Sequence, residues 1–246
     1  MSEDAAIAAR LSTVRARVAR AEQTAGRPPG EVRLMLATKT QSAAVIRAAL
    51  LADTVACVAS GLVPVLLGEN RVQEAVTTAT GLADLHPQIH LIGPLQSNKI
   101  NHALRAVDCV QTVATLDLAG RLSLRCATTD RVLDVMVQVN VSGEPTKSGV
   151  PPEAAVDLAT QVAALPGLQL VGFMTIGANT RDTGLVLAGF SRLREVRDEL
   201  VASDAPGAAT ARELSMGMSG DLEDAIAEGA TIVRVGSAVF GSRPPA

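Results

Sequence analysis

Lys39 is the residue of this chain best suited to chemistry, because it follows directly on the first strongly apolar run, residues 32–38. The chain has only three lysines, against nineteen arginines. A primary amine can be desolvated, lose its proton and condense with an aldehyde, whereas a guanidinium stays protonated and is a poor nucleophile. Lys39 is therefore a candidate carbonyl-binding amine. The alternative is a strand-terminal lysine that reaches for solvent.

Two loops in the last part of the chain have residues that suit a phosphate group. Gly236 lets the backbone approach a ligand closely, and Ser237 would begin a short helix whose free N–H groups favour an anion. Ser215 could add a hydroxyl donor. Ordinary loop and capping chemistry is the alternative for these residues, and it is the preferred interpretation of Ser219, which we expect at a helix N-terminus.

Three further basic residues have more than one interpretation. Arg234 lies inside an apolar run on the same face as Gly236, and a buried charge needs a partner. That partner is either a buried carboxylate or a ligand ring or phosphate, and the spacing leaves both open. Lys99 and Lys147 lie in polar loops, where solvent exposure or a salt bridge is expected and a secondary anion contact is the alternative.

Other kinds of site have no support in the sequence. The three histidines, His86, His90 and His102, do not have metal-ligand spacing, and no HExxH or paired Cys/His motif occurs. A GxSxG motif, a GxGxxG motif and a phosphate-binding P-loop are also absent. We therefore predict no metal site and no serine hydrolase.

Composition limits the environment and the partners. A net charge of −3 without basic clusters or aromatic platforms argues against nucleic-acid binding. Cys57, Cys109 and Cys126 are far apart and indicate reduced thiols. The start of the chain lacks the pattern of a secretory signal, and the nearly uninterrupted apolar stretch 55–67 is too short for a membrane span. We expect a cytoplasmic protein that does not bind a membrane.

Strand-like runs alternate with segments of helical length along nearly the whole chain. The runs lie near residues 32–38, 63–67, 89–93, 109–113, 132–141, 168–176, 213–216 and 231–235. This alternation implies a parallel sheet, and eight such units match a TIM-type (β/α)8 barrel, with a doubly wound open sheet as the alternative. An amphipathic helix over 3–25 precedes the first strand. We predict an α/β fold in one domain, residues 1–246: a single barrel with an extra N-terminal helix.

The barrel would bring the candidate residues to one face, because active sites in this fold lie at the C-terminal ends of the strands. Lys39 follows the first strand and Asn70 the second. Ser215 ends the seventh strand, and Gly236 and Ser237 follow the eighth.

The motifs at these strand ends, taken together, resemble a known family. They are 36–40 (LATKT), 68–74 (GENRVQE), 90–99 (HLIGPLQSNK), 139–142 (VNVS), 147–149 (KSG), 214–219 (LSMGMS) and 233–241 (VRVGSAVFG). In this order, over nearly the whole chain, they resemble the pyridoxal phosphate homeostasis protein family, a single-barrel relative of the alanine racemase N-terminal domain. The resemblance implies that Lys39 carries pyridoxal 5′-phosphate (PLP) as a Schiff base. It also implies that Ser215, Gly236 and Ser237 hold the phosphate.

The resemblance further implies that Arg234 lies near the pyridine nitrogen or the phosphate, and Asn70 near the ring. Racemisation needs acid–base groups on both faces of the substrate carbon. Alanine racemases use a tyrosine opposite the lysine, and this chain has none. We therefore expect a non-catalytic, monomeric PLP carrier that supplies apo-enzymes. A PLP-dependent racemase is the alternative, and a lysine aldolase acting on a sugar phosphate is a third class.

Overall fold

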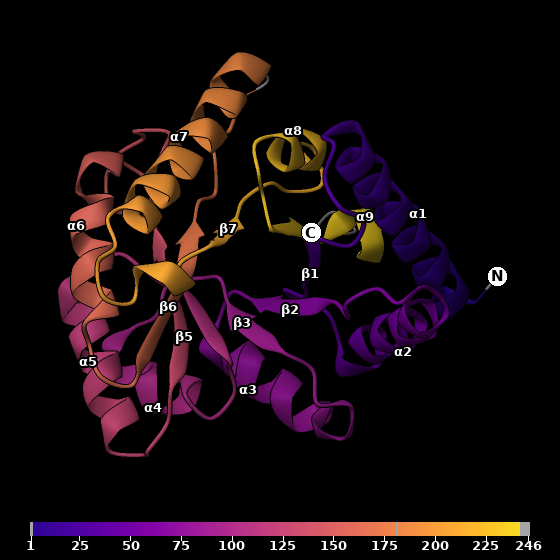
Figure 1. The fold of residues 1–246 in the computed structure, drawn as a ribbon. Helices are drawn as coiled ribbons and strands as arrows, with labels where there is room; N and C mark the ends of the chain where they lie inside the picture. Colours follow the sequence, from indigo (N-terminus) through magenta and orange to yellow (C-terminus); the bar gives the residue numbers. More distant parts are fainter. Residues whose placement is uncertain (1, 181, 242–246) are drawn as a thin grey trace.

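The strands form a closed barrel of eight parallel strands in the order β1 to β8 (Figure 1). The computed structural model describes residues 2–180 and 182–241. The last strand pairs back with the first, for example Arg234 with Met35. The predicted barrel is therefore confirmed, and the open sheet is excluded.

The elements alternate as predicted. The strands are β1 (Arg33–Ala37), β2 (Leu66–Glu69), β3 (Ile89–Leu91), β4 (Cys109–Val113), β5 (Leu133–Gln138), β6 (Leu168–Met174), β7 (Glu213–Ser215) and β8 (Ile232–Val235). The α-helices are α1 (Glu3–Thr24), α2 (Ala43–Ser60), α3 (Val72–Gly81), α4 (Ile100–Ala103), α5 (Leu116–Ala127), α6 (Pro152–Ala163), α7 (Thr183–Ala202), α8 (Leu222–Ala227) and α9 (Ser237–Phe240). Short 3₁₀ turns are η1 (Ala83–Leu85), η2 (Ser97–Lys99) and η3 (Ala208–Thr210).

The strands are apolar on both faces because each face is covered. Successive side chains of a strand point to opposite sides. In β1, Leu34 and Leu36 belong to the core under the helices, whereas Met35 points into the barrel. The interior cluster consists of Met35, Leu66, Cys109, Met136, Met174 and Ile232. This packing explains why the runs read as continuously hydrophobic.

The predicted N-terminal helix is α1. The hydroxyl of Ser2 accepts a hydrogen bond from the Ala5 amide at 3.3 Å, which satisfies a free N–H at the start of the helix. Its buried face is spaced three or four residues apart and includes Ile7, Leu11 and Val14. This face packs beside α2, α8 and α9, so α1 joins the first and last parts of the chain (Figure 1).

The second strand differs from its prediction. The run 63–67 was expected to be the strand, but β2 spans Leu66–Glu69. Helix α2 continues to Ser60 and ends at Gly61, whose φ of 68° is left-handed, and Pro64 lacks the N–H that a central strand needs. Gly68 instead pairs with neighbours on both sides, Ala37 and His90. The strand therefore includes Gly68 and Glu69, the first two residues of the 68–74 motif, which the predicted strand did not contain.

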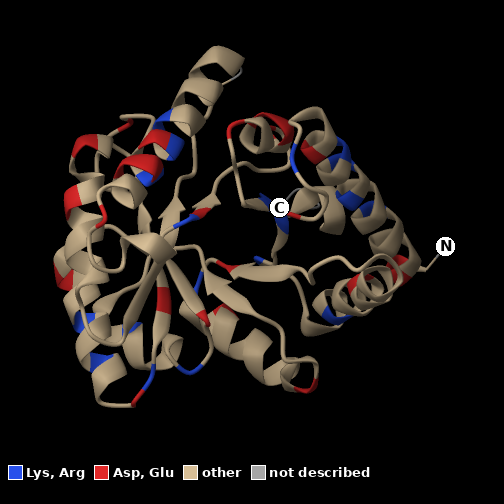
Figure 2. Ribbon diagram, in the orientation of Figure 1, with Lys and Arg blue, Asp and Glu red and all other residues tan. Residues whose placement is uncertain are grey.

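Helix α2 is the one helix of the described residues that is long and apolar enough to cross a membrane, with a mean hydropathy of 1.7. Core helices of soluble proteins meet the same criterion. In this fold α2 packs beside α1, where Arg15 donates to Asp53 at 2.7 Å, and Ile46 and Ala49 are among its buried residues. Basic and acidic residues are interspersed over the outer helices (Figure 2). The three cysteines are free, as the sequence indicated, and the structure shows that all three are buried.

Candidate functional site

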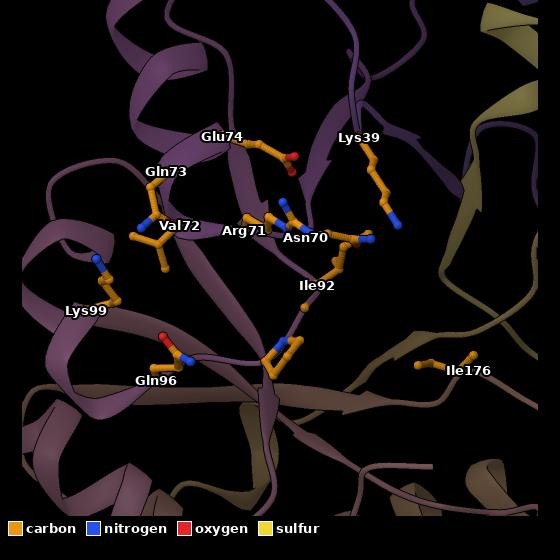
Figure 3. Close-up of a pocket in the computed structure, with 12 residues that line it drawn as sticks. Lys39, Asn70, Arg71, Val72, Gln73, Glu74, Ile92, Gln96, Lys99 and Ile176 are labelled. Atoms are coloured by element: carbon orange, nitrogen blue, oxygen red, sulfur yellow. The ribbon is translucent and has the colours of Figure 1, made fainter. Parts of the chain in front are cut away.

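Two adjoining pockets lie at the C-terminal ends of the strands and share Asn70, Ile92 and Ile176. The lysine pocket, of about 830 Å³, is lined by Lys39, Asn70, Arg71, Val72, Gln73, Glu74, Ile92, Gly93, Pro94, Gln96, Lys99 and Ile176 (Figure 3). The arginine pocket, of about 430 Å³, is lined by Ala37, Asn70, Ile92, Met174, Ile176, Met218, Ser219, Gly220, Arg234, Gly236 and Ser237. Five of the six predicted site residues therefore lie at two connected pockets.

Lys39 stands in a tight turn just beyond β1. The amide of Gln41 donates to the carbonyl of Thr38 at 2.9 Å, and Thr40 has a left-handed φ of 66°. The amide of Thr38 donates to Gly68 of β2 at 3.1 Å, which ties the turn to the sheet. The side chain of Lys39 is exposed and extends into the pocket (Figure 3). Its amine is therefore accessible to a small molecule.

Asn70 is held at the boundary of the two pockets by close packing with Gly93. A Cβ atom on Gly93 would lie 2.1 Å from the carbonyl oxygen of Asn70, so only glycine fits there. The hydroxyl of Thr112 donates to the Gly93 carbonyl at 2.9 Å. The loop after β3 therefore supports the residue that follows β2.

Arg234 is a buried cation without a carboxylate partner among the residues that the structure describes. Its Nη1 donates to the carbonyl and the hydroxyl oxygen of Ser215 at 2.7 and 2.8 Å, and its Nη2 donates to the Thr175 carbonyl at 2.6 Å. A guanidinium has five N–H donors, so two remain. Burial lowers the pKa of Arg234 to about 10, opposed by the charge of Asp221. Arg234 therefore stays charged at neutral pH.

Ser215 lines neither of the two pockets. It is fully buried, and its hydroxyl donates to Oε1 of Gln111 at 2.7 Å while accepting from Arg234. A hydroxyl with both functions engaged has little left for a phosphate. The structure thus separates Ser215 from the other predicted phosphate ligands and gives it a role in holding Arg234.

The hydrogen-bond chain from Arg234 continues across the barrel interior. Nε2 of Gln111 lies 2.8 Å from Nδ1 of the buried His90. Burial, with a smaller contribution from the charge of Arg33, lowers the pKa of His90 to about 3. The imidazole is therefore neutral and accepts at Nδ1, because the Gln111 amide nitrogen can only donate. The sequence did not reveal this chain, whose members lie on four strands.

Gly236 and Ser237 line the arginine pocket, as expected for a phosphate cradle, and Ser219 joins them. The prediction that Ser219 begins a helix is wrong, because α8 starts at Leu222 with Asp221 as its N-cap residue. The intervening turn leaves Ser219 at the pocket wall. Ser219-Gly220, like Gly236-Ser237, places a serine next to a glycine after a strand. This shared pattern was the signal in the sequence.

Two acidic residues near Lys39 were also missed. Glu69, in β2, is buried, and burial raises its pKa, with a further contribution from the charge of Glu74 and opposing hydrogen bonds from Thr78 and Thr38. Glu74 lines the lysine pocket. Both acids belong to the 68–74 motif, which spans the end of β2 and the start of α3, but only the fold shows that they lie together.

The remaining two lysines differ in their surroundings. Lys99 lines the lysine pocket. Lys147 forms a loop salt bridge with Glu144 at 2.6 Å and donates to the Gly177 carbonyl. The salt bridge lowers the pKa of Glu144. Of the two loop lysines, only Lys99 is placed to meet a ligand in these pockets.

Comparison with known proteins identifies the family. A model of the alanine racemase N-terminal domain matches residues 9–244. The pyridoxal phosphate homeostasis protein of Pseudomonas aeruginosa is 44% identical over 237 residues, which cover 96% of each chain. That of Escherichia coli K12 is 35% identical over 244 residues, covering 96% of this chain and 97% of the relative. This chain belongs to the pyridoxal phosphate homeostasis protein family.

Solved structures agree with membership of this homeostasis family. A protein of unknown function from Bifidobacterium adolescentis is 43% identical, has a TM-score of 0.90 and covers 97% of this chain and 96% of its own. PipY of Synechococcus elongatus, solved with PLP bound, is 34% identical with a TM-score of 0.79, over 96% of this chain and all of PipY. An alanine racemase of Clostridium difficile, at 14% identity and a TM-score of 0.67, shares the barrel fold alone, and this chain covers 56% of it.

Proposed function

We propose that this chain binds PLP, holds it reversibly on Lys39 and supplies it to apo-enzymes, acting as a cytoplasmic monomer without a substrate of its own. One observation carries the proposal. The accessible amine of Lys39 and the buried guanidinium of Arg234, which has no carboxylate partner among the described residues, line two connected pockets at the same end of the barrel. The structure of the relative PipY with PLP bound supports it.

The chemical groups of the site fit this cofactor. PLP supplies an aldehyde that forms a reversible imine with a primary amine, together with a ring nitrogen and a phosphate. Lys39 provides the amine. The two remaining N–H donors of Arg234 suit the ring nitrogen or the phosphate, and Gly236 with Ser237 forms the cradle for an anion. Asn70, at the boundary of the pockets, would contact the ring.

The lining of the arginine pocket favours a carrier over an enzyme. In the part of the chain that the structure describes, the arginine pocket has no carboxylate, histidine, cysteine or tyrosine in its lining. Arg234 is charged, and it would disfavour a protonated pyridine nitrogen, so the ring would be a weaker electron sink for a carbanion. The naming of the curated relatives as homeostasis proteins points the same way.

The covalent part of the proposal is tested by absorbance. Wild-type protein incubated with PLP and dialysed should be yellow, and borohydride reduction followed by peptide mapping should find the label on Lys39. Lys39→Ala should lose the colour and keep the wild-type circular dichroism spectrum. Lys99→Ala, a change of a second lysine at the same pocket, should stay yellow. A Lys39→Ala protein that remains yellow after dialysis contradicts the proposal.

The carrier role needs a separate measurement. PLP-loaded protein mixed with an apo-enzyme should restore the activity of that enzyme, and light scattering should give the mass of a monomer. Incubation of the loaded protein with a panel of L-amino acids should produce no D-enantiomer by chiral chromatography. Interconversion of any of them would replace the carrier with the racemase.

A further inference from the structure

One methionine of this chain differs from the others in its surroundings. The chain has six methionines, and among them only Met1 lies outside the described residues. Four of the others are at most 1% exposed: Met35, Met136, Met174 and Met216. Met218 is 41% exposed. A thioether is oxidised to a sulfoxide where an oxidant can reach it. Within residues 2–180 and 182–241, Met218 is therefore the methionine that is open to this reaction.

The cysteines do not compete with Met218 for an oxidant. Cys57, Cys109 and Cys126 are all buried. Burial raises the pKa of each of the three thiols, so they stay protonated at neutral pH. The thiolate is the form that oxidants attack, and a protonated, inaccessible thiol reacts slowly. The sulfur chemistry of the described chain is thus concentrated at one side chain.

A tight turn holds Met218 in the lining of the arginine pocket. Gly217 has a left-handed φ of 86°, and a Cβ atom there would lie 2.4 Å from the Cβ of Ala225 in α8, so only glycine fits. The carbonyl of Gly217 accepts a hydrogen bond from the amide of Arg234 at 3.0 Å, which ties the turn to β8. The exposed thioether therefore lies at the pocket that also contains Arg234, Gly236 and Ser237.

We propose that Met218 is an oxidation site and that its sulfoxide weakens cofactor binding at the arginine pocket. A peroxide transfers one oxygen atom to the thioether. The O–O bond breaks, an S–O bond forms, the sulfur is oxidised and hydrogen peroxide is reduced to water. The apolar side chain becomes a polar one, whose oxygen loses its water when a ring covers it. The effect on the cofactor rests on the proposed function, whereas the site of oxidation does not.

Peptide mapping of the PLP-free full-length protein tests the site. The protein is treated briefly with hydrogen peroxide, the reaction is stopped with catalase, and fragment spectra locate the added oxygen atom. Met218 should be oxidised first. Met216, two positions away and fully buried, is the internal reference and should lag far behind. Loading with PLP before the treatment should slow the reaction at Met218, because a ligand in the pocket shields its wall. Equal rates at Met216 and Met218 overturn the proposal.

Absorbance titration with PLP tests the consequence for the pocket. Oxidised wild-type protein should bind PLP about tenfold more weakly, the loss expected when a ligand covers a polar group that has no partner. The two methionine sulfoxide reductases, one for each epimer, should restore the affinity. The affinity of Met218→Leu should be the same before and after peroxide. Met136→Leu, at a buried methionine, should lose affinity on oxidation as the wild type does.

Met218→Gln gives the same answer without an oxidant, because it places a polar side chain at the pocket wall. It should bind PLP more weakly than untreated wild type by a factor similar to that of oxidation. Wild-type affinity in both Met218→Gln and the oxidised protein overturns the consequence for the pocket. Failure of the proposed function is distinct, since untreated wild type would then not turn yellow with PLP and the mapping of Met218 would be unaffected.

Discussion

The hydroxyl oxygen of Ser215 accepts a hydrogen bond from Nη1 of Arg234 at 2.8 Å, and the same nitrogen donates to the Ser215 carbonyl at 2.7 Å. Ser215 therefore fixes the guanidinium through contacts that are buried and do not line either pocket. The two serines that were predicted to contact the phosphate thus have different roles, because Ser237 lines the pocket and Ser215 does not.

Substitution of these two serines should separate stability from affinity. Ser215→Ala leaves Oε1 of Gln111 and one N–H of Arg234 without a partner inside the barrel. This should lower the free energy of unfolding by about 1–3 kcal/mol. Ser237→Ala, at an exposed position, should unfold like the wild type and bind PLP more weakly. Urea unfolding and absorbance titration measure the two effects. A Ser215→Ala protein as stable as the wild type contradicts the structural role.

Gly93→Ala should disturb Asn70. Its methyl group would lie 2.1 Å from the Asn70 carbonyl oxygen, so the backbone must move, at a cost of about 1–3 kcal/mol or more. Gly120→Ala is the matched control, because a methyl group there meets nothing within 4 Å and Gly120 lies inside α5. It should stabilise the protein by about 0.5–1 kcal/mol. Thermal unfolding of both variants tests the contrast, and equal effects would refute it.

His90 should make the protein less stable in acid. The pKa of His90 is lowered from 6.5 to about 3 by burial, so between these values the unfolded chain binds a proton that the folded chain does not. The free energy of unfolding should therefore fall as the pH drops from 6.5 toward 3. Nitrogen NMR of the labelled imidazole should show one neutral tautomer throughout pH 5–8. A titration of His90 within that range would disprove its buried, neutral state.

Glu69→Gln should stabilise the protein at neutral pH. Burial raises the pKa of Glu69, so the folded state favours the protonated form and loses stability as the pH rises through that pKa. Glutamine keeps the oxygen that accepts from Thr78 at 2.6 Å and removes the buried charge. The difference in melting temperature between variant and wild type should be positive at pH 7 and shrink toward pH 4. A lower melting temperature at pH 7 would mean that the charge is compensated.

The sequence was sufficient for the barrel because each strand carries its own local signal. Apolar runs of strand length, separated by helical segments, predict eight strands and the strand ends that carry Lys39 and Asn70. The start of β2 was misplaced, since Val63 and Pro64 are as apolar as the true strand and only pairing with β1 and β3 distinguishes them. A local sequence pattern carries no information about which residues of neighbouring strands pair.

Contacts between distant strands account for what the sequence did not show. Ser215 meets Gln111 across the barrel, 104 positions away in the chain, and no spacing rule links them. The position of Glu74 at the lysine pocket likewise depends on the packing of α3 beside the turn that holds Lys39. Residue types at strand ends could be predicted to gather, but which of them line the pocket and which are buried behind the lining depends on contacts that the sequence does not show.

The pairing of β1 with β8 and the contact of α1 with α9 join the first and last elements of the described chain. Arg10 of α1 donates to the carbonyl of Val239 in α9 at 2.5 Å. During synthesis on the ribosome, Lys39 is therefore made long before Gly236 and Ser237, and the barrel can close only once β8 has emerged. A chain that stops short of β8 would have the amine without the anion cradle.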